Sequence, residues 1–585
     1  MKKTCIYLIL LGFVATGCNS DTLFPIDFDP WSDTSSGTVP DAEDDITSIP
    51  TSGAALDSED EIAGTKFSYT INIHFSDTEG ATVTGDKNGI VSVSGNDVTV
   101  NNTTGDKISY ELSGTASDGF FKVYSDKKQA LILNGLDLTN KRGAAINNQG
   151  KKRCFVVVQG TNKLADGPGY TLTPDDEDEK AAFFSEGQLL FSGEGELTVT
   201  ATGKAGITSD DYVRFLASPT VRVSSSAGHG IRGKDAVIVS DGNIFATVSA
   251  DMKKGVCSDS LVRFDGGATE IKVTGGTAYD DEDKEYKGTA GVKADQRFEM
   301  NGGSLVVTNS GTGGKGISGD ALGIFAGGTV SVTVTGANYG KSSNGFGGSS
   351  NSDDSVGAKG IKFDGDLYFT GSTVTVSAKS HEGIEAKGVL AVTDGSVCSQ
   401  SADDAINSGK TMSLRGGYVC GLSSGNDGID ANGNLFIKGG LVYASCSGTP
   451  EVAIDANTEG GYHLYVQGGT LIAIGGIERS SGLSQDCWQA SSWTGGKWYS
   501  LTAGTTSLAF QTPAKGGSGL VVSAASEPTL KSGVTASGGT PVLDGLVLLS
   551  PTVSGGSSVT LSTYTSSGGS TPGFGGGGGP TGPRF

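Results

Sequence analysis

The chain has 585 residues, among them 94 glycines and 15 prolines, and 7% of its residues are aromatic. No Gly-x-y period runs through it, which excludes collagen, and glycine costs about 1 kcal/mol per helix position, which excludes a helix bundle. The net charge of −22 at pH 7 opposes direct binding to nucleic acid, so a strand-and-turn repeat protein with neutral or cationic ligands is the class that remains.

The N-terminus has the features of an export signal. Lys2 and Lys3 precede an apolar stretch over residues 6–14, which is too short to span a bilayer and is followed by Gly17 and Cys18. We predict a lipoprotein signal peptide over residues 1–17 and lipidation of Cys18, with an ordinary cleaved signal as the alternative. The expected location is the outer membrane, facing the periplasm or the cell surface, with the lipid as the only membrane contact.

Two terminal segments have the composition of disordered chain. Residues 18–65 contain twelve Asp and Glu, no Lys or Arg, and four spaced prolines, so they cannot bury enough apolar surface to fold alone. We predict an acidic disordered tether there. Residues 566–585 are rich in glycine and are predicted to be a disordered tail.

An internal repeat lies between these segments. Each unit contains an anchor residue, aliphatic in all but one, that follows a glycine or alanine, and then a polar turn, a strand, a glycine-rich turn and a second strand. The anchors are 22 to 25 residues apart except at three insertions. They are Ile146, Phe183, Ile207, Ile231, Val256, Val292, Ile317, Ile361, Ile384, Ile406, Ile429 and Ile454.

Short strands at this period predict an all-β fold, a right-handed parallel β-helix in which each unit forms one coil. The anchors would stack inside, and the small residue before each would sit at a tight bend. We assign residues 66–475 to a carbohydrate-binding β-helix domain on the resemblance described next, and residues 476–565 to a β-rich C-terminal cap that protects the exposed strand edges. A leucine-rich repeat or a propeller fits the period less well.

Several segments of the repeat resemble one bacterial family. They are Gly105–Thr115, Leu133–Leu138, Ala144–Ile146, Gly160–Gly167, Gly228–Asp235 and Asp427–Ala431. Together they are similar to carbohydrate-binding β-helix proteins, a family known for polysaccharide-lyase-like folds, calcium binding and affinity for plant cell-wall polysaccharides. The resemblance implies a polysaccharide partner and bound Ca²⁺, without assigning individual ligands.

Carboxylates gather around the last anchors. They stand one to three residues before or one residue after the anchor: Glu382, Asp403, Asp404, Asp427, Asp430 and Asp455. Equivalent positions of a β-helix stack about 5 Å apart, so ionised neighbours repel by about 3 kcal/mol at an effective dielectric constant of 20. A calcium ion would relieve this repulsion, because Ca²⁺ accepts six to eight oxygens in irregular geometry. Solvated turns capped by Asp and Asn are the alternative.

Aromatic residues cluster near the C-terminus. Trp488, Trp493, Trp498 and Tyr499 lie within twelve residues of one another. Exposed aromatic faces bind sugar rings, so we predict a carbohydrate-binding platform. A plug at the end of the helix is equally compatible with the sequence.

From these features we predict an exported lipoprotein that binds polysaccharide, of plant cell-wall or host origin, without catalysis. The enzyme alternative is a calcium-dependent lyase with Lys387 as base, or a glycoside hydrolase with Asp403 and Asp404 as its carboxyl pair. An adhesin that binds protein is a further alternative.

Overall fold

The computed structural model describes residues 39–51, 57–171, 174, 177–340, 355–446, 448, 450–479 and 481–566. Cys18 and nearly all of the predicted tail lie outside these residues. Within them, no helix is both long enough and apolar enough to cross a membrane.

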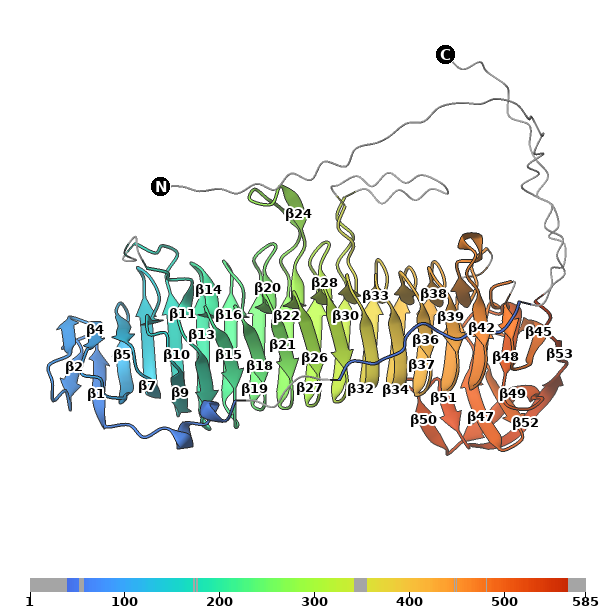
Figure 1. Cartoon of the computed structure of the whole chain (residues 1–585), viewed down its shortest axis with the longest axis horizontal. Helices are drawn as coiled ribbons and strands as arrows, with labels where there is room; N and C mark the ends of the chain where they lie inside the picture. Colours follow the sequence, from blue (N-terminus) through green and yellow to red (C-terminus); the bar gives the residue numbers. More distant parts are fainter. Residues whose placement is uncertain are drawn as a thin grey trace, which may run out of the picture. The chain divides into compact units, whose positions relative to one another are not determined.

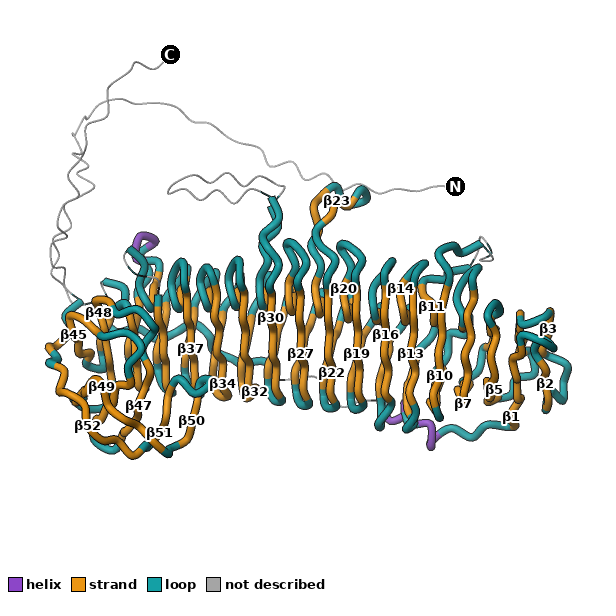
Figure 2. The backbone as a smooth tube through the Cα atoms, turned by 180° about the vertical axis from the view of Figure 1, so that it is seen from behind, coloured by secondary structure: helices purple, strands orange, loops and turns teal. Residues whose placement is uncertain are grey.

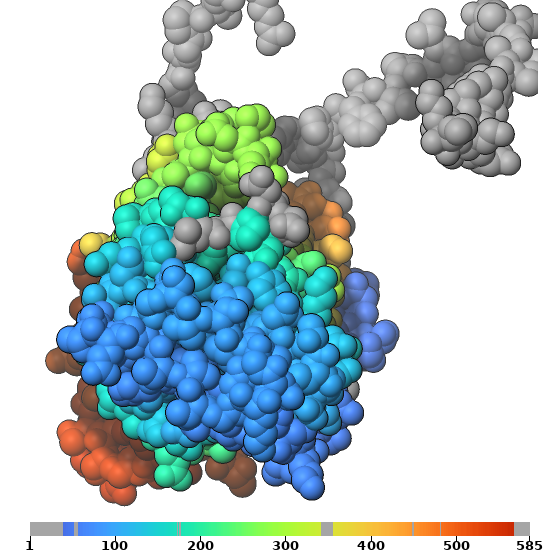
Figure 3. Space-filling model, turned by 90° about the vertical axis from the view of Figure 1, so that its left-hand side faces the viewer, coloured from blue at the N-terminus to red at the C-terminus, as the bar shows by residue number. Residues whose placement is uncertain are grey.

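The described chain is built almost entirely from strands. About 14 turns of a parallel β-solenoid follow one another from the N-terminal to the C-terminal end (Figures 1 and 2), and 2% of the chain is helical. The parallel β-helix expected from the repeat is therefore confirmed. In the space-filling view from the N-terminal end, the first strands and turns cover the end of the stack (Figure 3).

The anchors all lie in one sheet, which we call the anchor face. Each anchor is at most 1% exposed and pairs with the anchors of neighbouring coils, as Ile429 does with Ile406 and Ile454. The strands of the anchor face are β3 (Val91–Ser94), β4 (Asp97–Asn102), β6 (Phe120–Ser125), β8 (Ile146–Asn148), β11 (Ala181–Ser185), β14 (Ala205–Ser209), β17 (Ile231–Gly233), β20 (Lys254–Ser258), β25 (Ala290–Ala294), β28 (Lys315–Gly319), β31 (Ile361–Phe363), β33 (Ile384–Ala386), β35 (Ile406–Ser408), β38 (Ile429–Ala431) and β41 (Ile454–Ala456).

Two further rows of strands complete each coil, and five strands run through both: β1 (Tyr69–Ser76), β5 (Ile108–Ala116), β7 (Gln129–Asn140), β32 (Leu367–Ala378) and β34 (Leu390–Ser401). The row that we call the strap face adds β9 (Cys154–Gln159), β12 (Leu189–Ser192), β15 (Tyr212–Phe215), β18 (Ala236–Val239), β21 (Leu261–Phe264), β26 (Arg297–Met300), β29 (Leu322–Phe325), β36 (Met412–Leu414), β39 (Leu435–Ile437), β42 (Leu464–Val466) and β44 (Gly482–Leu483). The third face adds β10 (Thr161–Asp166), β13 (Glu196–Ala201), β16 (Thr220–Ser225), β19 (Asn243–Val248), β22 (Ala268–Val273), β27 (Ser304–Asn309), β30 (Thr329–Val334), β37 (Tyr418–Ser423), β40 (Leu441–Ser445) and β43 (Thr470–Ile474).

At Gly316 the bend before the anchor is as tight as the sequence predicts. A Cβ atom on Gly316 would lie 2.2 Å from Cγ1 of Val332, a core residue of the third face, and 2.6 Å from the backbone oxygen of Gly360. Such a contact is far shorter than van der Waals separation, so a larger residue would push the two faces apart.

The C-terminal segment forms a second, antiparallel unit. Its six-stranded sheet contains β46 (Trp498–Ala503), β47 (Thr506–Gln511), β49 (Thr529–Ser537), β50 (Thr540–Val542), β51 (Val547–Leu549) and β52 (Thr552–Val559). Strands β45 (Cys487–Trp493), β48 (Gly517–Ser523) and β53 (Ser562–Thr563) extend the last coils in antiparallel fashion. The sheet shares a hydrophobic core with Leu441 and Tyr443 of the third face, and so covers the outward side of the last coils.

Short elements outside these sheets are few in the described chain. The strand β2 (Thr82–Thr84) pairs with β1, and β23 (Ala278–Asp280) forms a hairpin with β24 (Glu285–Lys287). The three short 3-10 helices are η1 (Ser58–Asp60), η2 (Ile62–Gly64) and η3 (Thr458–Gly460).

The described part of the predicted tether is ordered, which corrects the expectation of disorder for those residues, while residues 18–38 and 52–56 lie outside the described chain. Residues 39–51 and 57–65, which we call the strap, lie against the outward side of the strap face and run opposite to the order of the coils (Figure 1). Near its start Asp44 accepts a hydrogen bond from Arg415 at 2.6 Å, and near its end Asp60 accepts one from Arg214 at 2.8 Å. Composition predicts disorder because it contains no information about these partners.

Apolar contacts accompany the ion pairs of the strap. Ile46 is 6% exposed and packs against Tyr368 and Ala391, while Ile62 packs against a cluster that includes Phe155. The strap therefore buries both apolar and charged positions of the strap face.

Replacement of Asp60 by asparagine should loosen the strap. Asp60 is 2% exposed and Arg214 4% exposed, so Asp60→Asn leaves a buried guanidinium without its counter-charge and should cost about 3 kcal/mol. Hydrogen exchange of the strap amides should speed up, and the exposed neighbour Asp45→Asn is the control. Equal protection in the two variants would contradict a holding role for Asp60.

Candidate functional site

The predicted carboxylates lie together on the outward side of the anchor face, over β33, β35, β38 and β41. Asp430 and Asp455 follow inward-facing anchors, so they point outward, and the register aligns both with Asn407. Asp404 and Asp427 stand two residues before their anchors and are each 7% exposed. The spacing of the repeat thus places these side chains in two neighbouring rows, one formed two residues before the anchors and one directly after them.

Two of the six predicted ligands already have positive partners. Lys359 Nζ lies 3.2 Å from Glu382 and 2.7 Å from Glu385, and His381 Nδ1 lies 3.1 Å from Asp403 and also contacts Glu382. The hydrogen bond from His381 lowers the pKa of Asp403. Burial alone would raise the pKa of Glu382, but His381 and Lys359 hold it below its ordinary value.

His381 responds to the same contacts. Burial opposes its protonation, yet hydrogen bonds with Asp403 and Glu382 raise the pKa of His381 to about 9. The imidazolium therefore serves as an internal counter-ion of Glu382 and Asp403 at neutral pH. The ligand atoms of His381, Glu382 and Asp403 lie within 4.8 Å of one another, so a metal ion could take the place of that charge.

The other four carboxyls have no such partner. Among the described residues, no ion pair to Lys, Arg or His includes Asp404, Asp427, Asp430 or Asp455. Burial and then the charge of Asp430 raise the pKa of Asp404 to about 8, and burial with Asp427 raises that of Asp430 to about 7. Burial also raises the pKa of Asp427 to about 6.

Polar neighbours link these carboxyls without neutralising them. Asn407 Nδ2 donates to Asp404 at 3.1 Å and to Asp430 at 2.6 Å, so the amide bridges two coils. Asp427 accepts a hydrogen bond from the backbone N–H of Val452 at 2.7 Å. These contacts fix the side chains in place while leaving the negative charge to be balanced by protons or a cation.

A seventh carboxylate, Glu478, belongs to the row directly after the anchors. Burial and a hydrogen bond with Glu478 raise the pKa of Asp455 well above its ordinary value, because two adjacent carboxyls cannot both ionise easily. Ile477 pairs with Ile454, so Gly476-Ile477-Glu478 has the same small residue, anchor and outward acid as the other coils. Extending the repeat by one period of 23 residues would have found it.

We call Asp404, Asp427, Asp430, Asp455 and Glu478 the uncompensated ladder. Its donors are all oxygens, the ligand type that Ca²⁺ prefers, and they are spread over successive coils. A hard divalent cation fits this donor chemistry better than a transition metal, which would favour nitrogen or sulfur.

The residues proposed for the two enzyme alternatives have different surroundings in the structure. Lys387 Nζ forms an ion pair with Asp364 at 2.7 Å, whereas the lysine that contacts Glu382 and Glu385 is Lys359. Asp403 has a lowered pKa and Asp404 a raised one, so the two carboxyls differ in protonation at neutral pH.

The predicted aromatic platform lies in the C-terminal unit. Trp488 is 9% and Tyr499 2% exposed, and both belong to the second hydrophobic core. Trp493 is half-buried and donates to Ser518, and Trp498 is half-buried as well. Trp488 and Tyr499 are thus core residues between the C-terminal unit and the outward side of the third face, while Trp493 and Trp498 retain partly exposed surface.

Comparison with known proteins places the solenoid in a family. A family model described as carbohydrate-binding domain-containing protein matches residues 94–419 and 354–509. A protein of that description from Acetivibrio thermocellus is 32% identical over 114 residues, which is 17% of this chain and 38% of the relative. The match therefore spans well under half of that relative.

A solved structure is also similar to part of the chain. It is the polysaccharide lyase-like protein from C. thermocellum, a gadolinium derivative, with 18% identity and a TM-score of 0.29. The match covers 55% of this chain and 96% of that one.

The uncompensated ladder should make stability depend on pH in the metal-free protein. The pKa values of Asp404, Asp427 and Asp430 are raised above those of the unfolded chain, so the folded state binds more protons. The contribution of these groups to the free energy of unfolding is therefore greatest below about pH 4. As the pH rises from there to about 8, this free energy falls by up to about 1.4 kcal/mol per pH unit for each extra proton bound by the folded state. Urea unfolding in EDTA between pH 5 and 8 measures this slope, and Asp404→Asn should reduce it. A slope equal in wild type and variant would show that Asp404 is not the titrating group.

Proposed function

The chain belongs to the family of carbohydrate-binding domain-containing proteins, and from this premise we propose that it binds polysaccharide without cleaving it, as an exported lipoprotein whose β-helix is stabilised by calcium. The family match along the solenoid is the observation that carries the proposal. Repeated coils suit a long polymer, because they offer side chains at a regular spacing along one surface.

The uncompensated ladder supports the calcium part of the proposal. Asp404, Asp427, Asp430, Asp455 and Glu478 would attract the ion, whose positive charge would offset the repulsion between them. Among the described residues, no three of these five present ligand atoms within 4.8 Å of one another, so water or the bound polymer would have to complete the coordination. The ion would also favour the ionised form of each carboxyl at neutral pH. Glu382 and Asp403 already have cationic partners, and a cation bound between them and His381 would have to displace the proton of the imidazolium.

The sequence of the N-terminus supports export and anchoring. The short apolar stretch before Cys18 is typical of a lipoprotein signal, and an outer-membrane location follows from it as a proposal. Incorporation of a labelled fatty acid that is lost in Cys18→Ala tests this step.

Binding without cleavage is supported by the position of Lys387. A lyase needs a base free to take a proton from the sugar, and the ammonium of Lys387 is engaged with Asp364. The second candidate is glycoside hydrolysis, which one observation favours: Asp403 and Asp404 have pKa values shifted in opposite directions, as an acid and base pair requires.

Affinity electrophoresis should separate these functions. We expect retardation of the purified protein in gels that contain pectin, cellulose or host glycan, with neither unsaturated product nor new reducing ends after incubation. Turnover that is lost in Asp404→Asn would instead establish the hydrolase. No retardation by any polysaccharide would contradict the proposed function and favour a protein-binding adhesin.

Calcium should raise the melting temperature through the uncompensated ladder. A site filled at one hundred times its dissociation constant contributes about 2.7 kcal/mol. Asp427→Asn and Asp430→Asn should each remove much of this increment, because each deletes a charged ligand. Calorimetric melts with calcium or EDTA measure it, and Asp364→Asn, on the same face but paired with Lys362 and Lys387, should keep the full increment. Identical melts with and without calcium would leave the ladder as solvated turns.

A further inference from the structure

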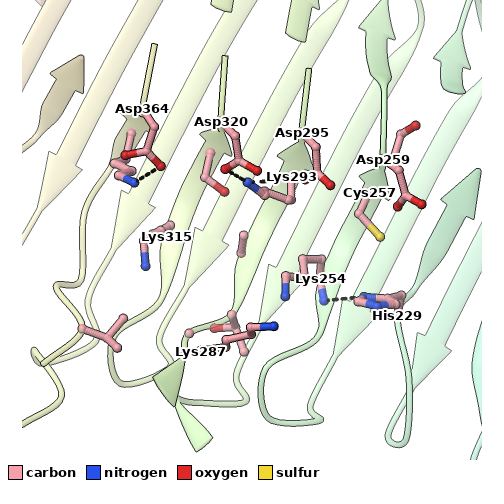
Figure 4. A pocket seen from close by; sticks show the side chains of 18 of the residues that line it. His229, Lys254, Cys257, Asp259, Lys287, Lys293, Asp295, Lys315, Asp320 and Asp364 are labelled. Carbon is pink, nitrogen blue, oxygen red and sulfur yellow. Dashed lines mark hydrogen bonds and ion pairs between the residues drawn. The ribbon is translucent and has the colours of Figure 1, made fainter. Parts of the chain in front are cut away.

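A cavity opens on the same anchor face, over β17, β20, β25, β28 and β31 (Figure 4). Its volume is about 650 Å³. Six carboxylates and six cationic side chains line this cavity, in a chain whose net charge is −22. The cationic side chains are Arg232, Lys254, Lys287, Lys293, Lys315 and Lys362.

Four of the six cations are already neutralised. Arg232 lies 2.7 Å from Asp259 and Lys362 lies 2.5 Å from Asp364. Lys293 pairs with Asp320, and Lys287 pairs with Asp280 and Asp283 of its own hairpin. Figure 4 shows four of the aspartates in a row along one side of the cavity, so these ion pairs form its edge.

Lys254 and Lys315 differ from this pattern. Lys254 Nζ donates to the backbone oxygen of Met252 at 2.6 Å, and Lys315 Nζ lies 3.5 Å from that of Gly313. No ion pair within the described residues includes either lysine. Each stands two residues before an anchor, the position that carries Asp404 and Asp427 further along the stack.

The surroundings of these two lysines raise the free-energy cost of keeping their ammonium groups charged. Burial, and then the charges of Lys362, Lys359, Lys254 and Lys293, lower the pKa of Lys315 to about 8. Burial also lowers the pKa of Lys254. His229, which accepts a hydrogen bond from the backbone of Lys254, is neutral because burial lowers its pKa to about 3. Keeping a half-buried ammonium group charged without a counter-ion costs free energy. An anion that enters from solvent would lower this cost through charge-assisted hydrogen bonds.

An aromatic wall stands beside the cavity. Tyr286 lines it from the hairpin β23–β24, which projects beyond the neighbouring turns (Figure 2), and its ring lies 5.1 Å from those of both Tyr279 and Tyr339. Tyr279 is 43% exposed. The three tyrosines come from two of the insertions that interrupt the repeat, and Tyr286 is the member of the group that lines the cavity. Tyrosine faces pack against the C–H faces of sugar rings.

We propose that this cavity binds an anionic substituent, a carboxylate or a sulfate ester, of the polysaccharide, with Lys254 and Lys315 as its charged contacts and the tyrosine wall against the sugar. This inference rests on the proposed function and names the class of polymer, an acidic one. Both anions are multidentate oxygen acceptors that a lysine ammonium binds as a point charge.

Matched oligosaccharides distinguish the two anions. Isothermal titration of the whole mature protein would use oligogalacturonate against its methyl ester, and carrageenan oligosaccharides against neutral agarose oligosaccharides. We expect the anionic member of at least one pair to bind about tenfold more tightly than its neutral partner. The pair that shows the difference identifies the substituent.

Lysine variants then locate the contact. Lys315→Met and Lys254→Met should each weaken binding of the anionic sugar about tenfold and leave the neutral sugar unchanged, consistent with the loss of one charge-assisted contact. Lys272→Met removes the same charge from an exposed position on the third face and is the control. Since burial opposes protonation of Lys315, Lys315→Met should melt at or above the wild-type temperature, so lost binding would not reflect unfolding.

The outcomes separate this inference from the proposed function. If wild type binds anionic and neutral sugars equally, or if Lys272→Met weakens binding as much as Lys315→Met, the cavity is not the anion site although polysaccharide binding stands. If no sugar binds at all, the proposed function fails and this inference with it.

Discussion

The in-register stacking of coils about 4.8 Å apart is the constraint on which the rest of the structure depends. It turns each position of the repeat into a continuous row, so one choice of residue type is repeated along the whole face. Inward rows can be filled by Ile, Val and Phe, since apolar side chains gain from being stacked. Outward rows of charge must be compensated by a neighbouring row, by another segment of chain or by a ligand.

The strap is one form of compensation. The outward row of the strap face is at most 9% exposed throughout. It contains Ala130, Phe155, Leu190, Arg214, Ile238, Arg263, Glu299, Ile324, Tyr368, Ala391, Ser413, Phe436 and Tyr465. Because polar and apolar residues alternate irregularly in this row, its sequence does not indicate that it is buried. The strap covers it near both ends, where aspartates pair with arginines and isoleucines pack against apolar side chains. An acidic segment is thereby ordered by the solenoid that follows it in the chain.

Periodicity decided what could be predicted from the sequence. The anchors recur every coil, so their stacking and the tight bend at Gly316 follow from spacing and from residue size alone. The rows of carboxylates follow for the same reason. The division of these rows into carboxyls with and without cationic partners does not follow from the spacing. The partners are His381, which directly precedes Glu382 and reaches Asp403, and Lys359, which lies one coil before Glu382. Glu478 was missed because the repeat was ended one coil too early.

The anchor face has two halves of opposite character, and this arrangement constrains how an acidic polymer could lie on it. Lys254 and Lys315 have no ion-pair partner among the described residues in one half, and the carboxyls of the uncompensated ladder have no basic partner there in the other. Lys359, in contact with Glu382 and Glu385, marks the boundary between the halves. A polyanion that extends past this boundary would be repelled by Asp404 and Asp430 unless a cation lies between them. Calcium on the ladder would then do more than stabilise the coils, since it would convert the acidic half into a continuation of the anion-binding surface. Protein stability and the length of polymer that can be bound would in this way depend on the same ion.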